Sequence, residues 1–234
     1  YNAANSNQGS QAIAIGEDAG ESNQAGGSIA IGPGSGNNTQ GTNSVAIGEG
    51  AANNNQGDYA ISIGNFTAAI QQGNNSIAIG IDAGKSTQGY YSIAIGADAG
   101  KSTQGNYSTA VGGRAGEITQ GNHSISLGRY SGYSNQIYGG IAIGYEAGKY
   151  TQGEEYSTAT TSDGYSIALG WKSGKYNQRS RSIAIGVLAG ECNLSDYSVA
   201  IGPYAGRSYA KEASISIGKN AGRSNQGTNS IAIG

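Results

Sequence analysis

A short phrase of alternating large and small apolar residues, Ser-Ile-Ala-Ile-Gly, returns along the chain every 16 residues. The glycine that closes each phrase marks the period, and the spacing is broken only once. The closing glycines are Gly16, Gly32, Gly48, Gly64, Gly80, Gly96, Gly112, Gly128, Gly144, Gly170, Gly186, Gly202, Gly218 and Gly234. Self-similarity at a fixed short period is typical of repeat proteins whose units stack on their neighbours, so we expect a single array over 1–234.

Each Ile-Ala-Ile triplet predicts a short β-strand, because its outer residues are β-branched and its side chains alternate in size. Glycines at so many closely spaced positions disfavour a helix, since each would cost about 1 kcal/mol. A unit of 16 residues has room for two strands joined by two glycine-assisted turns. The sequence therefore predicts an all-β fold, a parallel β-solenoid or β-roll with 16 residues per coil.

The two isoleucines of a triplet point to one face of the strand and the alanine points to the other. We expect isoleucines such as Ile77, Ile79, Ile93 and Ile95 to form apolar ladders inside the coil. The alanine column then faces outwards, and its small uncharged side chains indicate that another copy of the chain lies against it. This predicted oligomer face consists of Ala14, Ala30, Ala46, Ala78, Ala94, Ala110, Ala142, Ala168, Ala184, Ala200 and Ala232. The alternative is that alanine merely suits a tight coil.

A column of glutamines lies eight residues after the closing glycine, and only Leu194 and Ala210 interrupt it. Stacked coils would place equivalent residues about 4.8 Å apart. We therefore expect an amide ladder, in which each side chain donates to the next coil. The predicted ladder consists of Gln8, Gln24, Gln40, Gln56, Gln72, Gln88, Gln104, Gln120, Gln136, Gln152, Gln178 and Gln226.

The single break in the period, between Gly144 and Gly170, places an insertion at 154–163. A tolerated surface loop is the favoured interpretation of this insertion, and a binding loop is the alternative.

Charged and aromatic residues gather in the variable columns just after the closing glycine. Sixteen tyrosines against one phenylalanine and one tryptophan indicate aromatic rings that keep a polar tip in water. We select Tyr130, Tyr156, Trp171 and Tyr204 as candidate exposed contact residues. Rows of exposed tyrosine suit a protein or carbohydrate partner, and they suit stacking between coils equally well.

Composition excludes several other classes of function. The net charge of -2 and the absence of a Lys/Arg run argue against nucleic acid as a partner. No apolar stretch approaches the roughly 18 residues that span a bilayer, so this segment is expected to make no membrane contact. His123 is the only histidine, and Cys192 is a lone cysteine in a column that mostly holds serine. We therefore expect no enzymatic activity, no metal and no cofactor.

Three phrases, Asn-Ser-Val-Ala-Ile-Gly at 43–48, Tyr-Ser-Ile-Ala-Ile-Gly at 91–96 and Tyr-Ser-Val-Ala-Ile-Gly at 197–202, resemble the head repeats of YadA-like trimeric autotransporter adhesins. Similar repeats occur in some phage and viral fibre proteins. The resemblance covers nearly the whole chain. It implies a left-handed parallel β-roll, three chains around a common axis, and an adhesive or spacer role at a surface.

The expected function is thus a structural fibre or adhesin head, displayed outside a cell or on a virion. Its expected partners are further copies of itself, as a homotrimer, and a host protein or glycan. A self-assembling filament subunit, with chains stacked end to end, is the second hypothesis. An ice-binding solenoid ranks third, because the threonines of its nearest column are mixed with asparagine and glutamine.

Overall fold

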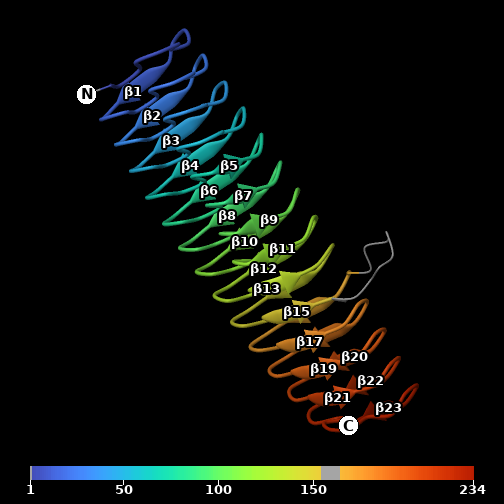
Figure 1. The fold of residues 1–234 in the computed structure, drawn as a ribbon. Helices are drawn as coiled ribbons and strands as arrows, with labels where there is room; N and C mark the ends of the chain where they lie inside the picture. Colours follow the sequence, from blue (N-terminus) through green and yellow to red (C-terminus); the bar gives the residue numbers. More distant parts are fainter. Residues whose placement is uncertain (1, 154–163) are drawn as a thin grey trace. The chain divides into compact units, whose positions relative to one another are not determined.

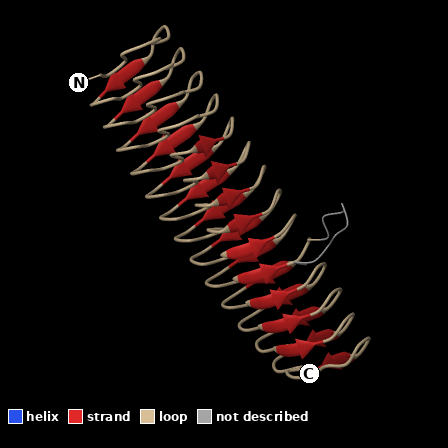
Figure 2. Cartoon of the chain, in the orientation of Figure 1, coloured by secondary structure: helices blue, strands red, loops and turns tan. Residues whose placement is uncertain are grey.

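The computed structural model describes residues 2–153 and 164–234, which form an all-β parallel solenoid with about 16 residues per coil and no helix (Figures 1 and 2). The predicted fold class is therefore confirmed, while the left hand implied by the resemblance stays a prediction. The chain divides into two compact units, 1–114 and 115–234, and both are built from the same kind of coil. The predicted insertion at 154–163, with Tyr156 in it, lies outside the described residues.

In the first unit, each Ile-Ala-Ile phrase forms one strand of a parallel sheet, and the glutamine column contributes to a second sheet on the other side of the coil. The first sheet contains β1 (Ile13–Ile15), β2 (Ile29–Ile31), β3 (Val45–Ile47), β4 (Ile61–Ile63), β6 (Ile77–Ile79), β8 (Ile93–Ile95) and β10 (Thr109–Val111). The second contains β5 (Gln71–Gln72), β7 (Thr87–Gln88) and β9 (Thr103–Gln104). Before β5, the glutamine side is paired only by isolated bridges such as Gln24 to Gln40.

The second unit repeats this plan. Its first sheet contains β12 (Ile125–Leu127), β14 (Ile141–Ile143), β16 (Ile167–Leu169), β18 (Ile183–Ile185), β20 (Val199–Ile201), β22 (Ile215–Ile217) and β23 (Ile231–Ile233). Its second sheet contains β11 (Thr119–Gln120), β13 (Ser134–Gln136), β15 (Tyr150–Gln152), β17 (Tyr176–Gln178), β19 (Cys192–Leu194) and β21 (Ser208–Ala210). Figure 1 shows these strands one above another along the stack.

Strand register follows the sequence period, so identical columns stack. Ala78 pairs with Ala94, the residue at the same place in the next coil. Across the insertion, Ala142 pairs with Ala168 and Gln152 pairs with Gln178. The coils on either side of 154–163 therefore stack in the same register as all the others.

The side chains of the Ile-Ala-Ile strands have the opposite orientation to the one predicted. Between the terminal coils, the alanines have no accessible surface, as Ala94 and Ala184 illustrate, whereas Ile79 is 36% exposed and Leu169 is 40% exposed. The alanine column therefore lines the coil interior and cannot be the oligomer face. This correction applies to Ala14, Ala30, Ala46, Ala78, Ala94, Ala110, Ala142, Ala168, Ala184, Ala200 and Ala232, of which only Ala14 and Ala232, in terminal coils, are partly accessible.

The reason for this orientation is that the interior is only one glutamine side chain wide. In the repeated contact, the glutamine Nε2 crosses the coil and donates to the carbonyl oxygen of the first strand residue on the opposite sheet, at 2.7–2.9 Å. Two sheets this close leave room for alanine and serine between them but not for isoleucine. The open alternative, that alanine suits a tight coil, is the one the structure supports.

The glutamines also form part of the predicted amide ladder. Gln56 Nε2 donates to Gln72 Oε1 at 3.1 Å, and Gln136 Nε2 donates to Gln152 Oε1 at 2.9 Å. Similar bonds join Gln8 to Gln24 and Gln120 to Gln136. The bond across the coil is the more regular one, so the column ties the two sheets together as well as successive coils.

The closing glycine is required by the stacking itself. Gly96 has a φ of +123°, and a Cβ placed on it would lie 2.9 Å from the carbonyl carbon of Gly112 in the next coil. A side chain at this position would therefore collide with backbone that cannot move without separating the coils. This steric limit explains why a phrase that is followed by another coil ends in glycine.

Candidate functional site

The outward-pointing residues of the first sheet form a continuous apolar surface in each unit. We call it the isoleucine face, and it consists of the first and third residues of each strand in that sheet. Nearly all of these residues are isoleucine, valine or leucine, and none is charged. Soluble monomers rarely expose contiguous apolar patches larger than a few hundred Å². The isoleucine face is therefore a surface on which a partner is expected.

A second feature lies in the turns of the second unit, where three lysines surround one carboxylate. Glu146 is buried, and its oxygens lie 2.8 Å from Lys149 Nζ, 2.8 Å from Lys175 Nζ and 3.9 Å from Lys172 Nζ. The lysines come from the same coil as Glu146 and from the next one. The site thus has more positive than negative charge.

Aromatic rings surround these ammonium groups. Lys149 Nζ lies 4.6 Å from the ring centre of Tyr130 and 5.1 Å from that of Tyr150. Such distances are within the range of cation–π attraction. The other rings are Trp171, 4.3 Å from Lys172 Nζ, and Tyr176, 4.8 Å from Lys175 Nζ.

Rings and charges together define the lysine–aromatic cluster, a surface built on coils before and after the insertion. Its members are Arg129, Tyr130, Tyr133, Glu146, Lys149, Tyr150, Trp171, Lys172, Lys175 and Tyr176.

Electrostatics keep the cluster charged near neutral pH. Burial alone would raise the pKa of Glu146, but hydrogen bonds from Lys149 and Lys175 outweigh it and hold the pKa below its usual value. Burial would lower the pKa of both Lys149 and Lys175, and their hydrogen bonds to Glu146 raise it instead. The three groups therefore stay ionised together.

The predicted contact residues fall into separate groups in the structure. Tyr130 and Trp171 both belong to the lysine–aromatic cluster, and Trp171 is 43% exposed. Tyr204 lies elsewhere, with the guanidinium carbons of Arg207 and Arg223 at 5.6 and 5.7 Å from its ring centre. The fourth predicted contact residue lies in the undescribed insertion.

Sequence reasoning missed the convergence of Lys149 and Lys175 on Glu146. The available signal was in the sixth position after the closing glycine, where only Tyr150 and Tyr176 are aromatic. That two such rings occur in successive coils marks this part of the surface as different from the rest.

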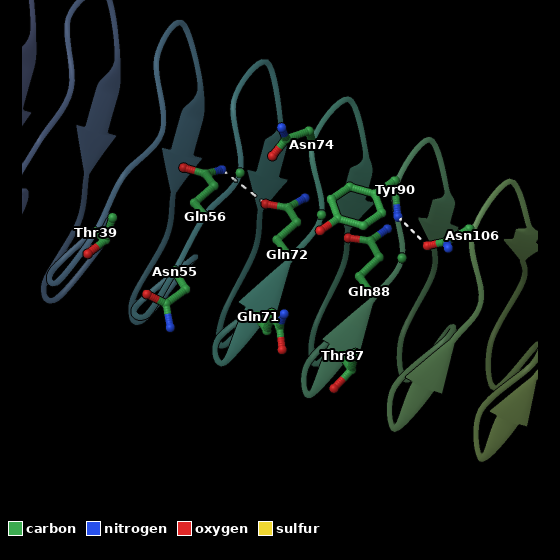
Figure 3. A pocket seen from close by; sticks show the side chains of 13 residues that line it. Thr39, Asn55, Gln56, Gln71, Gln72, Asn74, Thr87, Gln88, Tyr90 and Asn106 are labelled. Carbon is green, nitrogen blue, oxygen red and sulfur yellow. Dashed lines mark hydrogen bonds between the residues drawn. The ribbon is translucent and has the colours of Figure 1, made fainter.

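A shallow groove of about 300 Å³ runs along the second sheet of the first unit, lined by uncharged polar residues (Figure 3). Its amides are largely used to join coils: Gln56 donates to Gln72, Asn74 Oδ1 accepts the backbone N–H of Asp58, and Asn106 Oδ1 accepts the backbone N–H of Tyr90. We therefore interpret the groove as a seam of the coil stacking.

The residues that could support other chemistry are dispersed. His123 stacks at a tilt on Tyr138, with ring centres 5.2 Å apart, and burial raises the pKa of the Cys192 thiol. Within 2–153 and 164–234, no group of three or more His, Cys, Asp or Glu residues is placed to hold a metal ion. The same ranges contain no helix that could cross a membrane.

Comparison with known proteins adds no assignment: no protein-family model matches the chain, and no curated protein matches it.

Proposed function

We propose that this protein is a structural fibre or adhesin-head segment that assembles with further copies of itself through the isoleucine face. The observation that carries the proposal is the orientation of the strand side chains, with alanine inside the coil and isoleucine outside it. The coil interior is already filled by alanine, serine and glutamine, so the large apolar residues are left on the outside. An apolar surface along a solenoid is costly in water unless another molecule covers it.

A second copy of the chain is the occupant that matches this face best. The apolar rows repeat at the spacing of the coils, so a partner fits them along the stack only if it carries rows at the same spacing. Another copy of the chain carries rows at this spacing because it has the same coils. The face also carries no charged side chain, so like-charge repulsion does not oppose self-association.

The resemblance to YadA-like heads and to viral fibre repeats supports three chains and a location outside a cell or on a virion. In such an assembly the first sheets face one another around the axis. The turns and the second sheets then point outwards and remain available for attachment.

Sedimentation equilibrium of the full chain tests this proposal, together with paired lysine substitutions. Ile79→Lys with Ile95→Lys places two charges on the isoleucine face, and the expected result is a folded monomer in place of the trimer. The matched control is Thr87→Lys with Thr103→Lys, which adds the same charge to exposed positions of the second sheet. This control should leave the mass of the assembly unchanged.

Three outcomes overturn the proposal: a wild-type monomer, an Ile79→Lys/Ile95→Lys variant that stays assembled, or a wild-type filament of open-ended length. The last outcome would support the end-to-end filament instead, and electron microscopy would show it directly.

A further inference from the structure

The lysine–aromatic cluster departs from the rest of the chain in the number of its aromatic and cationic side chains. In the equivalent columns of the other coils, the only aromatic residues are Tyr1, Phe66 and Tyr204. The cluster carries five aromatic rings and four cations, three of which lie within 4 Å of the Glu146 carboxylate. None of this is needed for stacking, because the other coils stack without it.

The excess of positive charge in the cluster indicates a negatively charged ligand. Lys149, Lys172 and Lys175 share one carboxylate, that of Glu146, and the Arg129 guanidinium adds a fourth positive charge over the Tyr130 ring. Glu146 fixes the ammonium groups in place, but it can neutralise only one of them. A partner that supplies negative charge would complete the site.

Ring geometry indicates the kind of ligand. Tyr150 and Tyr176 stack on each other, with ring centres 5.4 Å apart and an angle of 10° between the planes. Each covers a face of the other, both rings stay more than a third exposed, and their hydroxyl groups are held by hydrogen bonds from Lys149 and Lys175. Hydroxyls at fixed positions suit a ligand rich in hydroxyl groups, and the exposed ring of Trp171 offers an apolar platform beside them.

We propose that the lysine–aromatic cluster binds an acidic polysaccharide, a sugar polymer that carries sulfate or carboxylate groups. The sugar hydroxyls meet the tyrosine edges, the apolar face of one sugar lies on Trp171, and the anionic groups complete the charge of the lysines. Single-stranded nucleic acid fits less well, because successive bases need successive open ring faces to stack on, and Tyr150 and Tyr176 cover each other's faces. The inference gives a ligand to the attachment role and so rests on the proposed function.

The test measures binding of the full chain to dextran sulfate, polygalacturonate, unsubstituted dextran and oligothymidylate by isothermal titration calorimetry. Dextran sulfate and polygalacturonate separate sulfate from carboxylate as the anionic group. Binding of at least one of them about tenfold or more tighter than both dextran and oligothymidylate is the expected result. Equal binding of dextran, equal binding of oligothymidylate, or no binding of either acidic polymer overturns the inference.

Substitutions locate the site. Trp171→Ala with Lys172→Gln should weaken binding of the preferred acidic polymer by about tenfold or more. Both residues lie at the surface, so the fold should be retained, which circular dichroism checks. Lys85→Gln removes the same charge from an ion pair in the first unit and should leave the affinity within about twofold of the wild type. If Lys85→Gln weakens binding as much as the double substitution does, the site lies elsewhere.

The assembly-face variant separates this inference from the proposed function. If Ile79→Lys/Ile95→Lys is a monomer that still binds the acidic polymer, though more weakly for lack of several sites per particle, both proposals stand. If wild type does not assemble but binds the polymer, only the proposed assembly fails. If it assembles but binds neither acidic polymer, only the ligand assignment fails.

Discussion

Two pairs of successive coils show how much of this molecule's surface can change without changing its backbone. In the first unit, 81–88 and 97–104 run Ile-Asp-Ala-Gly-Lys-Ser-Thr-Gln and Ala-Asp-Ala-Gly-Lys-Ser-Thr-Gln. In the second, 145–152 and 171–178 run Tyr-Glu-Ala-Gly-Lys-Tyr-Thr-Gln and Trp-Lys-Ser-Gly-Lys-Tyr-Asn-Gln. The glycine and glutamine columns are identical, and the buried alanine column changes only to serine. The outward columns differ, so the turn surface is where this fold can acquire a ligand.

The charges of the two pairs differ at a single position. Asp98 in the first unit and Lys172 in the second occupy the same place in their coils. With aspartate there, acids and lysines alternate: Lys101 Nζ lies 3.0 Å from Asp82 and 2.8 Å from Asp98. With lysine there, one carboxylate is left for three ammonium groups. One reversed charge thus separates an alternating ion-pair ladder from a cationic site.

The largest expected effect comes from removing the central acid of each pair. Glu146→Gln leaves three neighbouring lysines without a counter-charge at a buried site, and we expect a loss of about 2–3 kcal/mol in the free energy of unfolding. Asp82→Asn removes a more exposed acid and should cost less than about 1 kcal/mol. Urea unfolding at neutral pH measures both. Glu146→Asp, which keeps the charge, is the control, and equal losses for the two amide variants would show that the pairs are energetically alike.

Acidification should reproduce part of that loss. The pKa of Glu146 is lower in the folded than in the unfolded chain, and so is that of Asp82, where burial opposes the shift and hydrogen bonds from Lys101 and Lys85 outweigh it. A lowered folded-state pKa adds stability that is present above the unfolded value and lost as the pH falls through the folded one.

The melting temperature should therefore fall as the pH is lowered from about 6 to about 3. Thermal melts at a series of pH values measure this fall. It should be shallower in Glu146→Gln than in wild type, and Asp82→Asn should flatten it less. A pH profile that Glu146→Gln leaves unchanged would mean that Glu146 is not coupled to folding.

The repeat pattern predicted the coil, the strands and the columns, because stacking forces each position to recur in the same environment. The prediction that the isoleucines lie inside the coil was wrong, because alternation divides residues into two faces without assigning either one to the interior. The width of the coil interior decides which face of the strand points inwards, and that width depends on how far the glutamine side chain reaches across the coil. A usable signal was present: Leu194 and Ala210 replace glutamine, and both are buried, as an interior column allows.

The lysine–aromatic cluster was also predicted only in part, and the reason is a different one. Sequence columns identified Tyr130 and Trp171 as outward residues in variable positions. The meeting of Lys149, Lys172 and Lys175 at Glu146 depends on how the turns of two coils lie against each other, and those coils are separated in the sequence by an insertion. The spacing of these residues along the sequence does not show that they meet at Glu146.

Transplanting the second surface onto the first unit should create a binding site. Ala97→Trp, Asp98→Lys and Ser102→Tyr together give 97–104 the aromatic and cationic pattern of 171–178. In a Trp171→Ala/Lys172→Gln background, we expect the transplant to raise affinity for the preferred acidic polymer about tenfold. Calorimetry measures the gain. Ala97→Trp with Ser102→Tyr, which leaves Asp98 in place, is the control, and a gain of equal size there would show that the reversed charge is unimportant.

The smallest expected effect separates the tyrosine ring from its hydroxyl. Tyr176→Ala removes the stack on Tyr150 and the ring beneath Lys175, and should cost about 0.5–1.5 kcal/mol of stability. Tyr176→Phe keeps the ring, so it should melt at nearly the wild-type temperature while binding the acidic polymer more weakly. Melting curves and calorimetry on the same preparations distinguish the two roles. If Tyr176→Phe is destabilised as much as Tyr176→Ala and binds as well as wild type, the hydroxyl serves the fold, and the tyrosine edges do not contact the ligand.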